Sequence, residues 1–229
     1  MSHAVFRLRA ERLARSTRPF IARGSKSPRC PRCRVKYSHC LCAYQPHVSS
    51  QAAVCLLMHD VEALKPTNTG WLIADVISDT FAFGWQRTHV DPGLLTLLQD
   101  DRFQPWLVFP GEFVQPAERV VNTVVPTPGK RPLFILLDAT WTEARKMFRK
   151  SPYLDRLPVL SLAPEEISRY RLRRSRRDDH FCTAEVAAMC LALAGEAEAA
   201  QALDTWLDLF SSHYLAAKRG LPNPSAGVA

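Results

Sequence analysis

Residues 132–150 of the chain read PLFILLDATWTEARKMFRK. Residues 132–138 form the most continuous apolar run in the sequence, which predicts a buried β-strand. A basic helical segment begins at Thr140, so Asp138, Thr140 and Trp141 fall together where strand becomes helix. Taken singly, each is explained by helix capping or packing. Together they place a carboxylate, a hydroxyl and an indole at a strand end, where a ligand could bind.

The same alternation of strand and helix continues outward from this stretch. We predict strands within residues 52–60, 80–85, 106–112, 132–138 and 159–162. We predict helices over 69–77, with Thr69 as its cap, over 91–100, from Thr140, and over 183–219 with a break near Gly195. This order predicts an α/β fold with a mostly parallel sheet and helices on both faces. Ligands of such sheets bind at the carboxyl ends of the strands.

Length and composition indicate a globular protein. The 229 residues are 47% hydrophobic and 23% charged, which fits one main domain with a small appendage. No apolar run is long enough to span a membrane, and the N-terminus lacks the apolar core of a signal peptide, so we expect a cytoplasmic protein. A flexible tail is expected at residues 220–229. No phosphate-binding loop or dinucleotide fingerprint is present.

Positive charge is concentrated in two blocks. The net charge is +8, residues 1–34 carry ten Lys/Arg against the single acid Glu11, and residues 169–177 hold six arginines. Such blocks suit a phosphate backbone, because each bound phosphate releases condensed counterions. A solvated charged face is the alternative for either block alone. Two blocks in one chain favour a nucleic-acid partner.

Four cysteines lie within thirteen residues, with the spacing C-x2-C-x6-C-x-C: Cys30, Cys33, Cys40 and Cys42. Four thiolates satisfy the tetrahedral preference of Zn²⁺ and leave no open position, so we predict a structural zinc site. Two disulfides, a redox pair and an iron–sulfur site are the alternatives, and His39 and His47 are possible substitute ligands. The other cysteines, Cys55, Cys182 and Cys190, lie in apolar contexts typical of core residues.

Polar loops follow three of the predicted strands, at residues 59–70, 109–112 and 138–141. If the strands are parallel, these loops share one edge of the sheet. Residues 180–185 open the long helical region and could present hydroxyl and backbone N–H groups to an anionic group. The combination suits a small zwitterionic ligand. Ordinary caps and turns explain each loop taken separately.

Several of these segments resemble, in order, the motifs of the DTW-domain family. DATWTEARKM (138–147) is similar to its D-x-T-W signature, and LLMHDVEALKPTNTGWLIADVI (56–77) to its first strand, acidic loop and Asn-Thr-Gly turn. LVFPGE (107–112), SRYRLRR (168–174) and CTAEV (182–186) resemble its remaining elements. The cysteine cluster and the basic arm resemble the N-terminus of bacterial members, so the resemblance spans residues 7–217.

The resemblance implies a SPOUT-like fold with a knotted C-terminal portion. It divides the chain into a basic arm with a four-cysteine zinc module (1–50), a SPOUT-like DTW domain (51–219) and the tail (220–229). It also implies transfer of the 3-amino-3-carboxypropyl group from S-adenosylmethionine to N3 of a uridine in tRNA, at position 47, releasing methylthioadenosine. A monomer is favoured over an oligomer.

The resemblance also implies site residues. The cofactor pocket would be lined by Asn68, Thr69, Phe109, Pro110, Gly111, Leu137, Asp138, Ala139, Thr140, Trp141, Cys182, Thr183, Ala184 and Glu185. The tRNA would be held by Arg7, Arg9, Arg12, Arg15, Arg18, Arg23, Tyr170, Arg171, Arg173, Arg174, Arg176 and Arg177, of which Tyr170 and Arg171 could instead face the methionine carboxylate. Uridine N3 must lose a proton to become a good nucleophile, and Asp138 is our candidate base.

Two other functions also fit the sequence. A SPOUT methyltransferase would use the same cofactor but release S-adenosylhomocysteine. A non-catalytic zinc-containing RNA-binding protein would account for the basic blocks and the cysteines, but not for the chemistry at the strand ends.

Overall fold

The computed structural model describes residues 3–21, 27–162 and 182–225. Its centre is a six-stranded sheet in the order β2-β1-β5-β3-β6-β4, in which every described pairing is parallel. The strands are β1 (Ala53–Met58), β2 (Thr80–Gly84), β3 (Phe103–Val108), β4 (Val120–Val121), β5 (Arg131–Asp138) and β6 (Val159–Leu160). The helices are α1 (Ala4–Ala14), α2 (Gly70–Val76), α3 (Pro92–Leu98), α4 (Trp141–Arg149), α5 (Thr183–Leu193) and α6 (Ala197–Arg219).

The apolar run that predicted a buried strand is β5, which lies between β1 and β3. Successive side chains of a strand point to opposite faces of the sheet, so a central strand buried on both faces must be apolar at every position. Leu133 and Ile135 belong to one core cluster, Phe134 and Leu136 to the other, and all four are buried.

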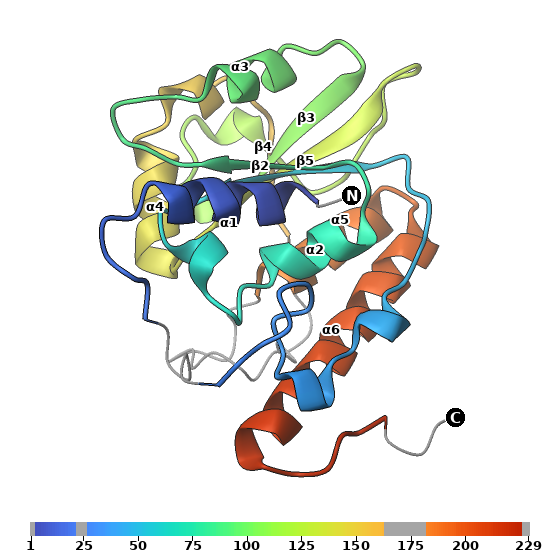
Figure 1. The fold of residues 1–229 in the computed structure, drawn as a ribbon. Helices are drawn as coiled ribbons and strands as arrows, with labels where there is room; N and C mark the ends of the chain where they lie inside the picture. The colour runs from blue at the N-terminus through green and yellow to red at the C-terminus, as the bar shows by residue number, and fades with distance from the viewer. Residues whose placement is uncertain (1–2, 22–26, 163–181, 226–229) are drawn as a thin grey trace.

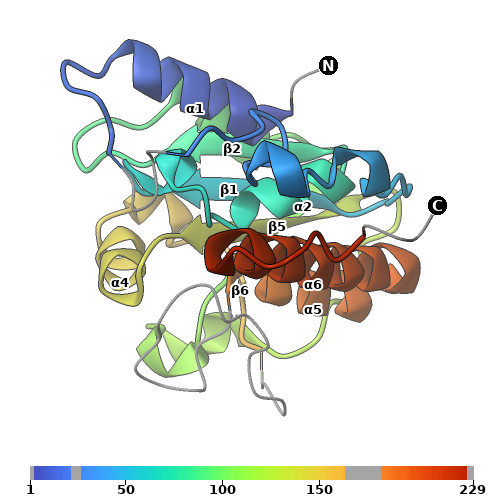
Figure 2. The same ribbon diagram turned by 60° about the horizontal axis from the view of Figure 1, so that its bottom comes forward.

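Helices cover both faces of the sheet, as predicted (Figure 1). The larger core lies between one face and helices α1, α2, α5 and α6, and it contains Trp71 and Phe210. The smaller core lies under α3 and α4 on the opposite face and contains Leu94 and Met147. Figure 2 shows α5 and α6 side by side on the larger-core side.

Two elements were not predicted. Helix α1 forms within the N-terminal arm, where Val5 and Leu8 are buried on the larger core. The two-residue strand β4 arises inside the proline-rich segment and pairs with β6. The predicted break near Gly195 is confirmed, because Gly195 adopts φ 81° between α5 and α6. This left-handed conformation ends a helix and suits glycine.

We expected a flexible tail from residue 220. In the described part, Asn223 Nδ2 donates to the Ser38 carbonyl, and the Leu221 carbonyl lies 2.9 Å from His39 Nε2. Residues 221–225 therefore contact the N-terminal cysteine module. No helix in the described parts of the chain combines the length and hydropathy needed to cross a membrane.

Candidate functional site

Asp138 is the last residue of β5, and its carboxylate is buried, with 1% of the residue exposed. The Asn68 side-chain amide donates to Oδ2 at 2.7 Å, and the Thr183 hydroxyl donates to Oδ1 at 2.7 Å. These donors come from the loop after β1 and the first turn of α5. Each oxygen therefore has a partner, as a buried carboxylate requires.

The loop before α2 differs from our prediction in one detail. The hydroxyl of Thr69 does not cap the helix; instead Asn68 Oδ1 accepts a hydrogen bond from the Trp71 backbone N–H at 3.1 Å. The Thr69 hydroxyl accepts from the Ala184 N–H at 3.4 Å. Asn68 can do both jobs because its amide has an acceptor for the helix and donors for Asp138.

The N-terminus of α5 contributes the second partner of Asp138. Cys182 is its N-cap, and the Cys182 N–H donates to Glu185 Oε2 at 2.8 Å, which fixes the turn that carries Thr183. Burial raises the pKa of the Cys182 thiol, so this side chain is neutral at pH 7. The segments around Asn68, Asp138 and Thr183 thus meet at the carboxyl end of the sheet, as the strand-end argument predicted.

Thr140 lies at the site edge, at the start of α4. Its hydroxyl and backbone N–H both donate to Glu143 Oε2, at 2.5 and 3.0 Å, forming the start of α4. Burial would raise the pKa of Glu143, but the Thr140 hydrogen bonds and nearby His59 outweigh it, so that pKa lies below its usual value. A lowered carboxyl pKa contributes stability at neutral pH that is lost as acid protonates the group. Glu143 Oε1 also lies 3.3 Å from His59 Nδ1.

Trp141 turns toward the loop after β3. Its indole stacks on Phe109 with ring centroids 5.6 Å apart and 12° between planes, and it meets Phe113 edge to face. Pro110 and Gly111 continue that loop, and the Gly111 N–H donates to Ser161 Oγ at 3.0 Å. Leu137 and Ala139 pack into the smaller core, away from Asp138. The predicted pocket residues gather at one edge but face different sides of it.

Gly70 is a site residue that we did not predict. A Cβ at this position would lie 2.5 Å from Asp138 Oδ2 and 3.2 Å from Leu56 Cδ1, closer than atoms can approach without displacement. The Asn-Thr-Gly sequence indicated only a turn. The missing side chain in fact leaves room for the carboxylate.

We expect Gly70→Ala to lower the free energy of unfolding by about 1–3 kcal/mol, because the methyl group must displace a hydrogen-bonded carboxylate. Chemical denaturation measures the change. Gly84→Ala is the matched control, since a Cβ there meets only Leu8 at 3.7 Å. Equal stability of the two variants would show that the Asp138 carboxylate can move aside without loss of stability.

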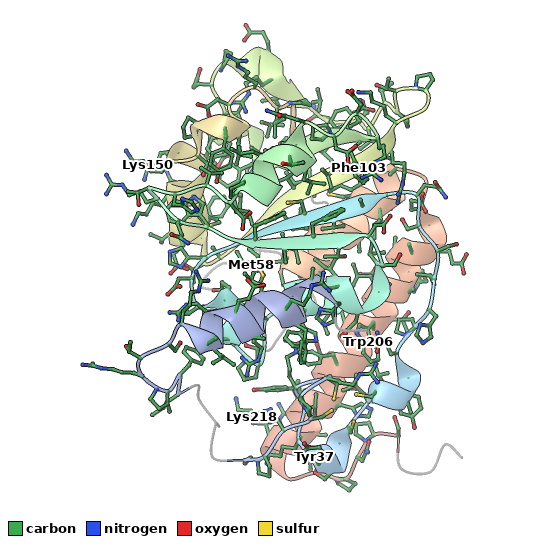
Figure 3. The ribbon with its side chains drawn as sticks, turned by 45° about the horizontal axis from the view of Figure 1, so that its top comes forward. Tyr37, Met58, Phe103, Lys150, Trp206 and Lys218 are labelled. Carbon is green, nitrogen blue, oxygen red and sulfur yellow. The ribbon has the colours of Figure 1, made fainter. Side chains whose placement is uncertain are left out.

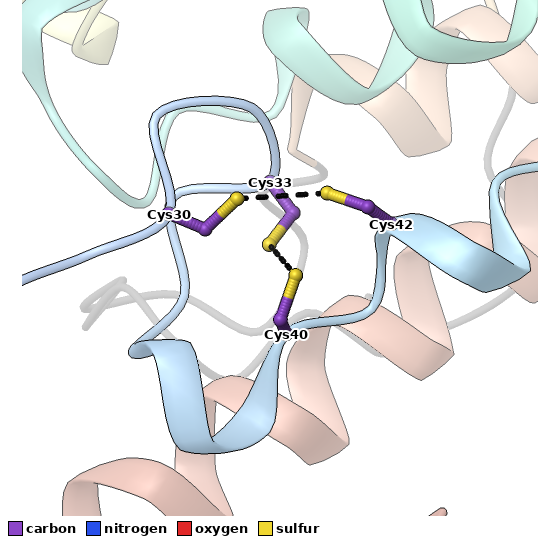
Figure 4. A group of neighbouring side chains, drawn as sticks. All are labelled: Cys30, Cys33, Cys40 and Cys42. Atoms are coloured by element: carbon purple, nitrogen blue, oxygen red, sulfur yellow. Dashed lines mark hydrogen bonds between the residues drawn. The ribbon is translucent and has the colours of Figure 1, made fainter.

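The four predicted metal ligands come together in space, and their Sγ atoms all lie within 4.8 Å of one another. The Cys30 and Cys42 sulfurs are 3.6 Å apart and those of Cys33 and Cys40 are 3.7 Å apart. Figure 4 shows the four side chains directed toward one another. A tetrahedron with Zn–S bonds of about 2.3 Å has edges of about 3.8 Å. Disulfide sulfurs are about 2.05 Å apart, so this spacing fits a metal and excludes bonded pairs.

The substitute ligands are not part of this group. His39 Nε2 lies 2.9 Å from the Leu221 carbonyl and His47 is exposed. Of the remaining cysteines, Cys55 and Cys190 are fully buried, as predicted for core residues. Burial raises the pKa of Cys55 to about 12, so it is no nucleophile at neutral pH.

Arg34 joins the cysteine module to the candidate site, and we did not predict this role. It follows Cys33, has φ 64°, and is 5% exposed. Its Nη1 donates to the backbone carbonyls of Asn68 at 2.8 Å and Pro66 at 3.2 Å. Its guanidinium lies 4.5 Å from the Trp71 ring centroid. Arg34 thus holds the loop whose Asn68 amide bonds Asp138.

The predicted RNA-binding residues divide into three groups. Arg7, Arg9 and Arg12 belong to α1, while Arg15 is its C-cap and Arg18 follows. Arg12 forms a bidentate pair with Asp60 at 2.6 and 2.8 Å. The rest lie outside the described residues: Arg23, Tyr170, Arg171, Arg173, Arg174, Arg176 and Arg177.

Comparisons with known proteins agree with the motifs. Over 176 residues the chain is 29% identical to tRNA-uridine aminocarboxypropyltransferase 2 of Drosophila melanogaster. The matched region covers 72% of this chain and 66% of that protein. The chain thus spans just under two thirds of that relative's length. No solved structure matches it significantly. The model of the DTW domain matches residues 27–215, which include the four cysteines, Asn68, Asp138 and Thr183. The chain therefore belongs to the DTW-domain family.

Proposed function

We propose that the protein transfers the 3-amino-3-carboxypropyl group of S-adenosylmethionine to N3 of a uridine in tRNA, at position 47, and releases methylthioadenosine. The family match and the name of the Drosophila relative support a tRNA-modifying transferase. The observation that carries the proposal is the buried Asp138, held by Asn68 and Thr183 at the carboxyl end of a parallel sheet. Such an edge is the usual ligand site of this architecture.

The reaction forms one bond and breaks one. N3 of the uridine attacks the Cγ carbon of the methionine portion, the Cγ–S bond breaks, and its electron pair converts the sulfonium to a thioether. The N3 proton must leave, and we assign Asp138 as the acceptor. The carboxylate also offsets the positive charge of the sulfonium in the ground state. Alignment of N3, Cγ and sulfur supplies a further part of the rate.

The predicted pocket residues have roles that differ with their placement. Asn68 and Thr183 bond the carboxylate, and the adjacent Thr69 and Ala184 bond each other, so this group is suited to orient the donor. Trp141 and Phe109 form a stacked aromatic pair at the same edge of the sheet. Cys182 contributes its backbone N–H, which fixes the first turn of α5, and a neutral thiol. The remaining pocket residues, Pro110, Gly111, Leu137, Ala139, Thr140 and Glu185, act through the backbone shape of their loops.

The other parts of the proposal concern the metal, the tRNA contacts, the fold, the location and the oligomeric state. We assign structural zinc to the four cysteines, and tRNA contacts to the six arginines between residues 7 and 23 and to Tyr170, Arg171, Arg173, Arg174, Arg176 and Arg177. We retain the knotted SPOUT-like C-terminal portion, a cytoplasmic location and a monomer as predictions from the family resemblance.

Mass spectrometry of tRNA incubated with the protein and S-adenosylmethionine tests the reaction. We expect one uridine to gain the aminocarboxypropyl mass and an equal amount of methylthioadenosine to form. A transcript with cytidine in place of the target uridine is the control and should remain unmodified. Methylated tRNA with S-adenosylhomocysteine would replace this proposal with a methyltransferase. Binding of tRNA without S-adenosylmethionine binding would favour a non-catalytic RNA-binding protein.

A further inference from the structure

A cavity of about 530 Å³ lies between α1 and the carboxyl ends of β1 and β2. It is lined by residues from three parts of the chain that the family motifs only partly include. Leu8, Arg12 and Arg15 come from α1 and its C-cap. Met58 and Gly84 are the last residues of β1 and β2, residues 59, 60 and 63 follow β1, and residues 85–87 follow β2. The volume is within the range of small-ligand sites, about 300–1,000 Å³.

The helical spacing of α1 and its C-cap explains why Arg12 and Arg15 face this cavity. Positions 8, 12 and 15 are separated by four and three residues, so they lie on one face of the helix. Leu8 packs on the core and aligns that face with the sheet edge. Arg12 is fixed by its bidentate pair with Asp60 and by a hydrogen bond to Ser16 Oγ at 2.8 Å.

The lining is strongly basic. It contains Arg12, Arg15 and Arg87 against the single carboxylate of Asp60. Arg15 and Arg87 are exposed. Neighbouring Arg12 lowers the pKa of Asp60, so that carboxylate stays ionised at neutral pH. The excess of guanidinium groups attracts an anion and offers the planar donor geometry that phosphate accepts.

The floor of the cavity is apolar and aromatic. Met58, Ala63 and Gly84 line it beside His59 and Trp85, whose rings stack 5.8 Å apart with 24° between their planes. Trp85 is anchored by donating its indole N–H to Ser151 Oγ at 2.9 Å. An aromatic and apolar floor under a cationic rim suits a nucleotide, which has a flat base and an anionic phosphate.

This cavity adjoins the candidate site through β1. Met58 is opposite Asp138 in the register of β1 and β5, and the His59 N–H donates to the Asp138 carbonyl at 3.0 Å. His59 also lies between Trp85 and Glu143 of the α4 cap. A nucleotide bound here would therefore lie at the end of β1, the strand next to β5, whose last residue is Asp138.

We propose that this cavity binds one nucleotide of the tRNA next to the target uridine, with its phosphate on Arg15 and Arg87 and its base toward His59 and Trp85. The inference rests on the proposed function, whose substrate it places. S-adenosylmethionine is a poor fit, because its sulfonium and ammonium exceed its one carboxylate and give it a net positive charge. The basic rim repels that charge and attracts a phosphodiester.

The first test removes the two exposed charges. For the variant Arg15→Gln/Arg87→Gln we expect tRNA affinity to fall about tenfold. The negative slope of the logarithm of the tRNA association constant against the logarithm of the salt concentration should become flatter by about 0.7–0.9 per lost phosphate contact. Fluorescence anisotropy with a tRNA transcript over a salt series measures both. The affinity for S-adenosylmethionine, measured by calorimetry, should be unchanged.

Arg102→Gln/Arg156→Gln is the matched control. It removes the same charge from two exposed positions that precede β3 and β6, at the amino-terminal edge of the sheet. In Figure 3, Phe103 marks the start of β3 and Met58 the carboxyl end of β1, at the other edge. We expect it to keep most of the tRNA affinity and the salt slope. If the two double variants lose affinity equally, a general charge effect explains the loss and the proposal is wrong.

The second test fills the cavity without changing charge. A Cβ at Gly84 makes an ordinary contact with Leu8 at 3.7 Å, so Gly84→Ala should bind tRNA nearly normally, while the larger side chain of Gly84→Val should weaken binding. Unchanged S-adenosylmethionine affinity confirms the fold of each variant. A Val variant with wild-type tRNA affinity, or one that loses only S-adenosylmethionine, would overturn the proposal. Neither readout needs turnover, so failure of the proposed reaction is detected separately.

Discussion

Asp138→Asn is expected to lower turnover on tRNA by about 100- to 10,000-fold, the usual contribution of a general base, with the affinity for S-adenosylmethionine and tRNA retained. The substitution keeps the shape of the side chain. Its amide oxygen can accept from Asn68, and its amide nitrogen can donate to the Thr183 hydroxyl, which is an acceptor as well as a donor. The fold should therefore survive, while the proposed acceptor of the N3 proton is lost.

Thr183→Val separates proton transfer from positioning. It removes the donor to Oδ1 but leaves the carboxylate and the Asn68 bond in place. We expect a smaller fall in turnover, about tenfold, because one hydrogen bond to a charged group contributes about 1.5–3 kcal/mol at most. Single-turnover kinetics and calorimetry on both variants give the comparison. Unchanged turnover of Asp138→Asn excludes the base, and equal losses in turnover and cofactor affinity would show that Asp138 only holds the pocket.

The strands were predictable because burial on both faces of a parallel sheet demands uninterrupted apolar runs. β1 and β5 fulfil this condition, and their central positions follow from it. β4 was not predictable, since two valines in a proline-rich segment carry no periodicity. Helix α1 was not predictable either, because three arginines interrupt its apolar pattern and its buried face is small, with Val5 and Leu8 as its large residues.

The meeting of the site loops was predictable, but the direction of their side chains was not. Parallel strands bring their carboxyl ends to one edge whatever residues follow them. Alternation along β5 then places Asp138 on the larger-core side and Leu137 on the other. Whether Thr140 bonds the carboxylate or Glu143 depends on cap geometry that adjacent positions in the sequence do not distinguish.

Residues that act across long sequence distances were missed for a related reason. Gly70 matters through a carboxylate that is distant in sequence, and Arg34 through two carbonyls of another loop. Neither contact leaves a local pattern. A non-glycine residue with φ above zero would have been a signal at Arg34, but backbone angles are not visible in the sequence.

Loss of the zinc that we propose for the cysteine cluster is expected to weaken S-adenosylmethionine binding at a site to which no cysteine of the cluster belongs. Structural zinc contributes about 10–16 kcal/mol of apparent binding energy in small modules, so Cys33→Ser or chelation should unfold the knuckle. Arg34 would then release the Asn68 carbonyl, and the Asn68 amide would lose its fixed position on Asp138. Metal analysis, thermal denaturation and calorimetry measure the three consequences.

Arg34→Lys tests the link without removing a metal ligand. Lysine keeps the charge but has no planar guanidinium that can lie over the Trp71 ring while one of its nitrogens donates to both carbonyls. We expect full metal content, a fall of about 2–3 kcal/mol in the free energy of unfolding, and weaker S-adenosylmethionine binding. Arg32→Lys is the matched control, since Arg32 is an exposed residue of the same knuckle. If Arg34→Lys binds S-adenosylmethionine as well as Arg32→Lys does, the cysteine module stabilises the fold without positioning the site. If only Arg34→Lys is impaired, the cysteine module positions Asn68 and Asp138 through the Arg34 guanidinium.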